Sequence, residues 1–169
     1  MAADLAVPTL GELLRLHGGI GDELIRRGVV RTGNNPCADL AETLFCRSFG
    51  WAHEPNSKKA YDALAPGGVR IQVKARRVTP RNASRQSGTL RKLEDGGFDR
   101  LAGLVFDAGY RVLLAFEMPH ALVRELARYS DHVKGSALHM RDDLLALRGV
   151  VDHTPRLRTA AEALLAGYC

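Results

Sequence analysis

Four polar side chains in the first half of the chain are of types that could form one catalytic site: Glu42, Asp62, Gln72 and Lys74. Residues 69–76 alternate apolar and polar side chains, which predicts a strand. Gln72 and Lys74 point to the same face of this strand, because side chains two residues apart share a face. An amide and an ammonium group therefore lie side by side on the predicted sheet.

A short strand is also predicted just before this one, with Pro66–Gly68 as the turn between the two. If the connecting loop covers residues 65–69, Leu64 faces Arg70 and Asp62 faces Gln72. A slip of one residue would place an isoleucine opposite the aspartate and destroy the grouping. The site therefore depends on the register of this hairpin.

Glu42 lies in a predicted helix over residues 35–49, which begins with the capping pair Asn35-Pro36 and ends at a glycine. Phe45 follows Glu42 by three residues and Phe49 follows it by seven, so Glu42 is expected on or beside the buried stripe. A carboxylate that faces a core needs a partner. We therefore expect Glu42 to face other charged groups.

This set of side chains suits divalent-metal chemistry on phosphodiesters. Mg²⁺ prefers oxygen ligands and usually takes only one or two carboxylates. Asp62 offers a charged oxygen, Gln72 a neutral side-chain oxygen, and the backbone carbonyl of Val73 a third ligand. Lys74 could stabilise charge on the phosphate or hold the attacking water, and Glu42 could bind the metal or its water, or orient Lys74.

A helix glutamate, then an aspartate, then an acidic residue or glutamine two positions before a lysine on a strand, resembles the PD-(D/E)XK nuclease superfamily. Here the pattern is Glu42, Tyr61-Asp62, nine intervening residues and Gln72-Val73-Lys74. The resemblance covers about residues 36–116. It implies the restriction-endonuclease-like fold, dependence on Mg²⁺ (with Mn²⁺ as a substitute) and hydrolysis of DNA phosphodiesters.

Two positions depart from the family pattern. Tyr61 replaces the proline before the aspartate, which the family tolerates. Gln72 replaces the acidic residue, a change that also occurs in the family and lowers the negative charge at the metal. An inactive or specialised member of the superfamily is therefore one of the alternatives.

Residues 70–92 contain eight basic side chains and no acidic one. The segment includes a long predicted loop, about residues 78–93, which directly follows the strand that carries Lys74. Such a composition is typical of phosphate contacts, although it also fits a mobile solvated loop. We expect nucleic-acid contacts from the basic residues Lys58, Arg76, Arg77, Arg81, Arg85 and Arg91.

The rest of the chain predicts a single α/β domain. Helices are expected over residues 9–28 (broken in two by Gly18, Gly19 and Gly21), 119–129, 140–147 and 154–166, and strands over 98–106 and 110–116. Helices, then strands, then helices favour α+β or α/β. The resemblance implies a central mixed sheet flanked by helices, with a nuclease core at about 36–129 and helical extensions at 1–35 and 130–169.

The composition is that of an ordinary globular protein with a basic surface. There are 24 lysines and arginines against 19 acidic residues, which gives a net charge of +5 and favours polyanionic partners. Three cysteines cannot all pair with each other, and no stretch is long and apolar enough for a membrane helix. We expect a cytoplasmic protein with free thiols.

The sequence thus predicts a Mg²⁺-dependent DNA endonuclease with no organic cofactor, in restriction, phage defence, repair or recombination. Cleavage of both strands of a duplex needs two sites, so a homodimer is expected. The alternatives are a non-catalytic nucleic-acid-binding module on the same fold, a repair or junction-resolving nuclease, and an RNA-binding or RNA-processing protein. In the least specific alternative, Asp62, Gln72 and Lys74 are ordinary surface residues of an edge strand.

Overall fold

The computed structural model describes residues 5, 7–55 and 60–167. Its helices are α1 (Leu10–Arg26), α2 (Cys37–Phe49), α3 (His120–Leu126) and α4 (Thr154–Leu165). Its strands are β1 (Ala52–His53), β2 (Ala63–Ala65), β3 (Val69–Arg77), β4 (Arg100–Phe106), β5 (Val112–Pro119), β6 (Arg128–Ser130), β7 (Gly135–Ala137) and β8 (Val151–Asp152). Short 3₁₀ turns lie at Pro66–Gly68, Leu93–Asp95 and Asp142–Ala146.

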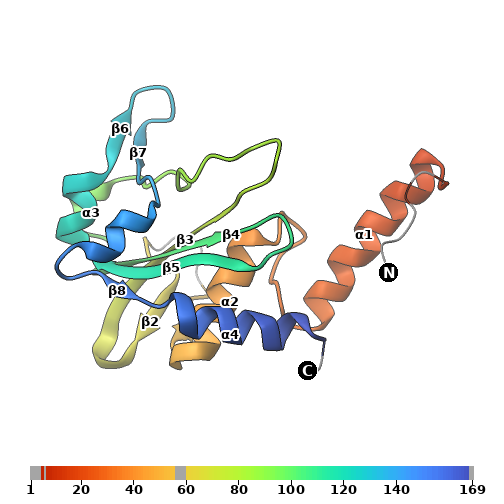
Figure 1. Ribbon diagram of the computed structural model, residues 1–169, viewed down its shortest axis with the longest axis horizontal. Coiled ribbons are helices and arrows are strands. Elements are labelled where there is room, and N and C mark those ends of the chain that lie inside the picture. Colours follow the sequence, from red (N-terminus) through yellow and green to blue (C-terminus); the bar gives the residue numbers. More distant parts are fainter. Residues whose placement is uncertain (1–4, 6, 56–59, 168–169) are drawn as a thin grey trace.

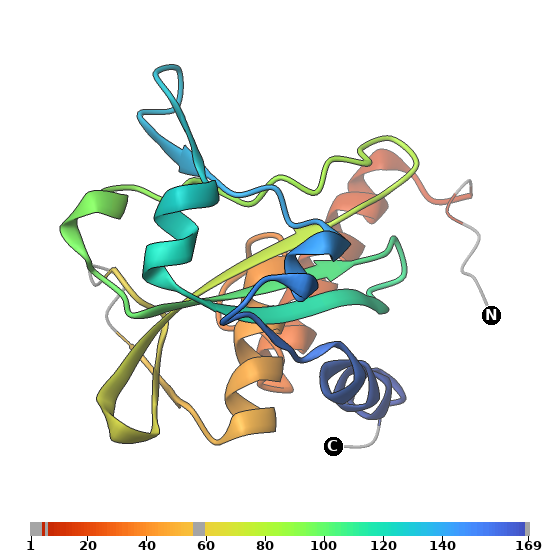
Figure 2. The same cartoon turned by 60° about the vertical axis from the view of Figure 1, so that its left-hand side comes forward.

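The centre of the molecule is a mixed six-stranded sheet in the order β1-β2-β3-β4-β5-β8. All neighbouring strands are antiparallel except β3 and β4, which run parallel. Helices α2 and α4 cover one face, and α3 lies on the other together with the β6–β7 hairpin (Figures 1 and 2). The prediction of an α/β fold with a mixed sheet flanked by helices is therefore confirmed at this level.

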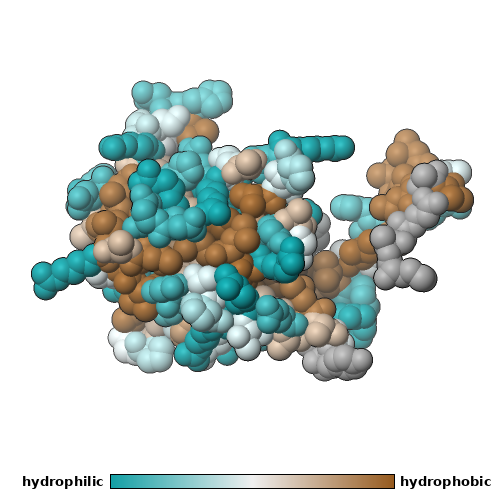
Figure 3. Space-filling view, in the orientation of Figure 1, coloured by the Kyte–Doolittle hydropathy of each residue, from teal (hydrophilic) through white to brown (hydrophobic). Residues whose placement is uncertain are grey.

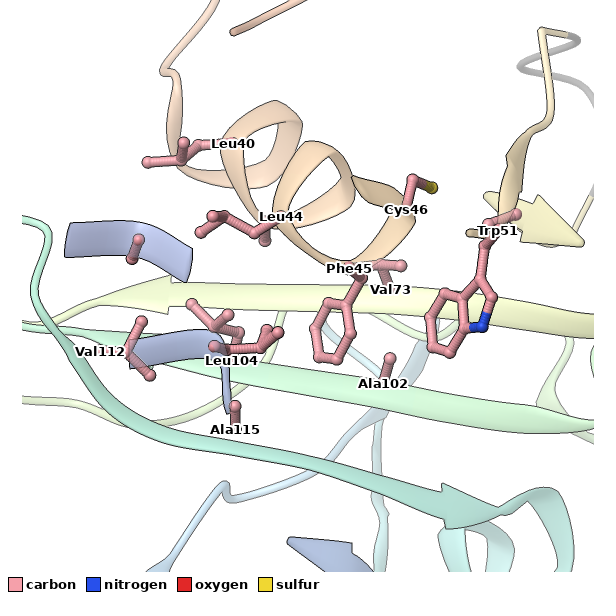
Figure 4. Packing of buried hydrophobic residues seen from close by; sticks show 14 of the residues in the cluster. Leu40, Leu44, Phe45, Cys46, Trp51, Val73, Ala102, Leu104, Val112 and Ala115 are labelled. Atoms are coloured by element: carbon pink, nitrogen blue, oxygen red, sulfur yellow. The ribbon is translucent and has the colours of Figure 1, made fainter. Parts of the chain in front are cut away.

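The apolar residues of α2 form the larger part of the core. Leu44 and Phe45 point from the helix toward Val73, Ala102 and Leu104 on the sheet (Figure 4). Trp51 stacks on Phe45, with ring centres 5.5 Å apart. The helix ends as predicted, because Gly50 adopts the left-handed conformation, with a φ of 67°, that favours glycine at a helix end. The side chain of Asn35 accepts a hydrogen bond from the Cys37 backbone N–H at 3.0 Å, so this part of the predicted start is also present.

The N-terminal segment differs from the prediction. It forms one continuous helix, α1, through Gly18, Gly19 and Gly21 instead of two short ones. Thr9 and Glu12 form a capping box at its start, and Glu23 pairs with Arg26 and Arg27 at its end. Helix α1 projects from the sheet, has no buried residue and exposes several leucines and isoleucines, which colour it brown in Figure 3.

The segment after residue 130, expected to be a helical extension, contributes to the central fold. Strand β8 pairs with β5 at the edge of the sheet, and Leu157 and Ala161 of α4 are part of the core. The predicted helix over 119–129 is shorter, since α3 ends at Leu126 and the chain then enters β6. Among the described residues, no helix is both long and apolar enough to cross a membrane.

Candidate metal and phosphate site

The hairpin that carries the candidate site has the predicted register. Ala65 is opposite Val69 and Leu64 is opposite Arg70. The intervening turn fits Pro66–Gly68, because Gly67 and Gly68 both have a φ of 79°, which L side chains rarely adopt. Asp62 lies just before β2, and its backbone N–H donates to the Ile71 carbonyl at 2.8 Å. This places the Asp62 side chain beside Gln72.

Asp62 Oδ2 accepts two hydrogen bonds from β3. One comes from the Val73 backbone N–H at 2.7 Å and the other from the Gln72 side-chain Nε2. The same Nε2 is 3.5 Å from the Val73 carbonyl oxygen. Burial raises the pKa of Asp62, and the Val73 hydrogen bond and the positive charge of Lys74 oppose that rise. The Gln72 side chain therefore lies within hydrogen-bond distance of both other groups predicted as metal ligands on this hairpin, the Asp62 carboxylate and the Val73 carbonyl.

Glu42 lies on α2 with only 10% of its side chain exposed. Arg31, in the segment before α2, forms an ion pair with Glu42 Oε2, and His53 Nδ1 lies 4.0 Å from the same oxygen. Burial, followed by the negative charge of Asp62, raises the pKa of Glu42 to about 7, against the opposing charges of Arg31 and Lys74. Glu42 thus has the charged neighbours that its position on the buried stripe requires.

Lys74 lies on β3 two residues after Gln72, next to Gly103 on β4. Its positive charge lowers the pKa of both Asp62 and Glu42. Asp62 and Gln72 are in direct contact, whereas Glu42 is linked to Asp62, and Lys74 to both carboxylates, only through the effect of their charges on pKa values. With Arg31 and Asp39 included, three carboxylates and two cations lie in this region, which leaves one negative charge when all five groups are ionised.

Arg31, His53 and Asp39 belong to this region and were not among the predicted site residues. Asp39 is buried in α2, and its Oδ2 accepts hydrogen bonds from the backbone N–H groups of Arg31 and Thr32, both at 2.8 Å. This buried aspartate fixes the backbone of the preceding segment. The sequence signal for Asp39 was its position three residues before Glu42 on the same predicted helix. No sequence pattern marks His53.

The arginines predicted to bind phosphate lie in different surroundings. Arg76 Nε donates to the Ser84 carbonyl at 3.1 Å, and the Arg77 guanidinium donates to the Ala108 carbonyl and lies over the Tyr110 ring. Arg85 forms a salt bridge with Asp142 at 2.9 Å, which offsets its charge. The exposed members of the set are Arg81 and Arg91, and Lys58 lies outside the described residues.

The basic loop between β3 and β4 forms backbone hydrogen bonds with the two-stranded sheet of β6 and β7 and with the residues that follow it. Ser87 N–H donates to the Leu138 carbonyl at 2.8 Å, and Leu90 N–H donates to the Ser136 carbonyl at 2.7 Å. Arg85 accepts a hydrogen bond on its carbonyl from the Met140 N–H at 3.0 Å. Backbone hydrogen bonds therefore tie the middle of this segment to residues 136–140.

The chain matches no model of a known protein family, and no curated protein matches it either. Within residues 5, 7–55 and 60–167, no three side chains of His, Cys, Asp or Glu are grouped so that they could hold a metal ion. A metal at this site would therefore depend on amide or carbonyl oxygens in addition to the carboxylates of Asp62 and Glu42.

Proposed function

We propose that the chain is a metal-dependent phosphodiesterase that cleaves DNA, as the resemblance to the PD-(D/E)XK superfamily implies. The observation that carries the proposal is the contact of Asp62 with Gln72 and Val73, with Glu42 and Lys74 close enough for their charges to act on it. Residues 20 positions apart on α2 and the hairpin supply these groups. An edge strand with an ordinary solvated face would not need a buried glutamate facing it.

The oxygen atoms of this cluster suit Mg²⁺, which prefers carboxylate and carbonyl ligands. Asp62, Glu42 and the Val73 carbonyl would hold the ion, and Gln72, whose Nε2 now contacts Asp62, could join them through its side-chain oxygen. The bound ion would supply an activated water and positive charge at the scissile phosphate.

The chain's own residues would do the remaining work. Lys74 places an ammonium group beside the two carboxylates, where it can hold a phosphate oxygen and balance the charge that builds up on it. Glu42, whose burial raises its pKa to about 7 in the metal-free chain, would be held as a carboxylate by the positive charge of a bound ion. The exposed Arg81 and Arg91 would contact phosphates away from the cleaved bond.

The test is a cleavage assay on supercoiled, linear and branched DNA with Mg²⁺, with Mn²⁺ and with EDTA. We expect metal-dependent cleavage that Lys74→Ala lowers by about 10²–10³-fold, the usual effect of removing one group that stabilises transition-state charge. Arg128→Ala, which removes a positive charge from the exposed part of β6, is the matched control and should cleave like the original chain. Absence of cleavage under every condition would refute the proposal.

A homodimer is part of the proposal, because cleavage of both strands requires two sites. Light scattering during size-exclusion chromatography, with and without a DNA duplex, measures it directly. A mass of about 37 kDa corresponds to two copies of the 18.4 kDa chain. A monomer in both conditions would restrict the proposed activity to nicking.

The contacts of the two carboxylates favour a second candidate, a nucleic-acid-binding module without catalysis. Arg31 is already paired with Glu42, and the Gln72 amide points its nitrogen at Asp62. A site with glutamine at this position attracts a divalent cation less strongly than one with an acidic residue.

Gln72→Glu separates the two candidates through thermal stability. A second carboxylate against Asp62 should lower the melting temperature in EDTA through repulsion between like charges. If the site binds Mg²⁺, the ion should restore that loss progressively, with the logarithmic dependence on concentration expected for one binding site. If Mg²⁺ leaves the melting temperatures of both the original chain and the variant unchanged, the binding module becomes the better conclusion.

A further inference from the structure

The backbone at Arg31, beside Glu42, is held in place by contacts with α2. Its backbone N–H donates to the buried Asp39, and the residue before it, Val30, is buried in the core. One residue further back, the Val29 carbonyl accepts a hydrogen bond from Thr43 Oγ1 at 3.0 Å. Two side chains of α2 therefore hold this segment, so the position of Arg31 is built into the fold.

The side chain of Arg31 connects the buried part of the site with solvent. It is 42% exposed, whereas its partner Glu42 is 10% exposed. A guanidinium group has five N–H donors, and among the described residues its hydrogen bonding is confined to one nitrogen, which donates to Glu42. Most of its donors are consequently available on the side that faces away from Glu42.

A guanidinium group can bind a carboxylate along one edge and a phosphate along another, which an ammonium group of lysine cannot do with the same geometry. Lys74 on β3 supplies the other cation whose charge acts on Glu42. A phosphate bound at the cluster could therefore pair with Arg31 as well as with Lys74.

We infer that Arg31 is a substrate-binding residue, whose guanidinium contacts a backbone phosphate of the nucleic acid while it remains paired with Glu42. This inference rests on the proposed function, since it places the phosphodiester at the same cluster. It adds a contact from the segment before α2, outside the basic block of residues 70–92. The merely structural alternative is that Arg31 only neutralises the buried Glu42.

The salt dependence of DNA binding, measured in EDTA by fluorescence anisotropy with a labelled duplex, tests this contact without any need for cleavage. A phosphate contact contributes about 0.9 to the slope of log K against log salt concentration. Arg31→Ala should therefore reduce the slope by about 0.9, and Arg31→Lys should retain most of it. An unchanged slope in a folded Arg31→Ala variant would overturn the inference.

Arg47→Ala is the matched control. Arg47 is exposed at the end of α2, and its guanidinium donates to the Gly28 carbonyl at 3.1 Å, so this variant also removes one charge and one contact between α2 and the preceding segment. We expect its slope to equal that of the original chain. An equal loss of slope in both variants would show that the effect comes from general charge or from loosening of the segment, and would refute a specific contact of Arg31.

A comparison in the Glu42→Gln background separates contact from neutralisation. Without a charged Glu42, a neutralising Arg31 has no role, so Arg31→Ala would then leave the slope unchanged. A residue that touches phosphate should still lower the slope by about 0.9 in this background. If the slopes behave in this way but no variant cleaves DNA, the nuclease proposal fails while the assignment of Arg31 stands.

Discussion

Replacement of Glu42 by glutamine should stabilise the protein at neutral pH, although Glu42 is proposed to be essential for activity. Burial and the charge of Asp62 raise the pKa of Glu42 from its ordinary value of 4.5 to about 7. The folded state therefore holds this proton more tightly than the unfolded state does. The free energy of unfolding therefore falls as the pH rises from about 4.5 to 7, because the folded state must then carry a buried negative charge that the unfolded state exposes to water.

The size of the effect follows from the two pKa values. At pH 8, ionised Glu42 should cost about 3 kcal/mol relative to a neutral side chain of the same shape. For a chain of this length that corresponds to a rise in melting temperature of about 6–12 °C in Glu42→Gln. Glutamine retains an oxygen that can accept from Arg31, so the hydrogen bond need not be lost. At pH 5 the difference should shrink to less than about 1 kcal/mol.

Urea unfolding of the original chain and of Glu42→Gln at several pH values between 5 and 8, all in EDTA, measures this difference. The chelator is needed because a bound divalent ion would stabilise the ionised form. Glu125→Gln, at an exposed position of α3, is the control and should change stability by less than about 0.5 kcal/mol at every pH. The reasoning is refuted if Glu42→Gln is less stable than the original chain at pH 8, or if the difference does not depend on pH.

Three further substitutions test the packing and the polar contacts around the site, each by urea unfolding. Gly103→Ala should lose about 1–3 kcal/mol, because a Cβ at this position would collide with the Phe116 ring; the same stability as the original chain would mean that the ring moves freely. Asp39→Ala should lose about 1–3 kcal/mol, since no side-chain oxygen then accepts the backbone N–H groups of the segment before α2. Burial raises the pKa of Glu117, but a hydrogen bond from His153 and the charge of Arg100 outweigh burial and leave the pKa lowered. Glu117→Gln should therefore be less stable than the original chain at pH 7. This difference in stability should shrink as the pH falls below about 4.5, because the ionised form that the fold stabilises is then lost. A gap that persists at pH 3 would contradict this account.

The hairpin part of the site could be predicted because its register is encoded locally. A turn that needs two residues with positive φ allows few alternatives to Gly67 and Gly68, and the alternation along β3 then fixes which side chains face Asp62. Helix α2 was predictable for the same reason, since its polar start and its terminal glycine both act on neighbouring residues.

The rest of the site depends on contacts between distant segments. Arg31 reaches Glu42 because Asp39 holds the intervening turn, and no periodic pattern in the sequence signals this arrangement. Arg85 was expected to bind phosphate, but it pairs with Asp142, which lies 57 residues later in the chain. A run of basic residues does not show which of them are neutralised by carboxylates elsewhere.

The direction of the Gln72 amide has a similar origin. In isolation the amide offers an oxygen and a nitrogen equally, and the carboxylate of Asp62 decides which of them faces it. The nitrogen presents its partial positive charge to Asp62 Oδ2 and lies 3.5 Å from the Val73 carbonyl oxygen. The amide therefore offsets part of the cost of the buried Asp62 carboxylate without any metal ion.

The pairing of Arg31 with Glu42 lowers the cost of a buried negative charge, as the contact of the Gln72 amide does for Asp62. Burial makes each of the two carboxylates costly, and the charge of Asp62 adds to the cost of ionised Glu42. A guanidinium beside Glu42 and an amide beside Asp62 reduce that cost. At the proposed metal site, the same two contacts would oppose the binding of a divalent ion, because both would have to rearrange or share their carboxylates. The proposal therefore predicts that substitutions at Arg31 and Gln72 change metal affinity and the stability of the metal-free protein together.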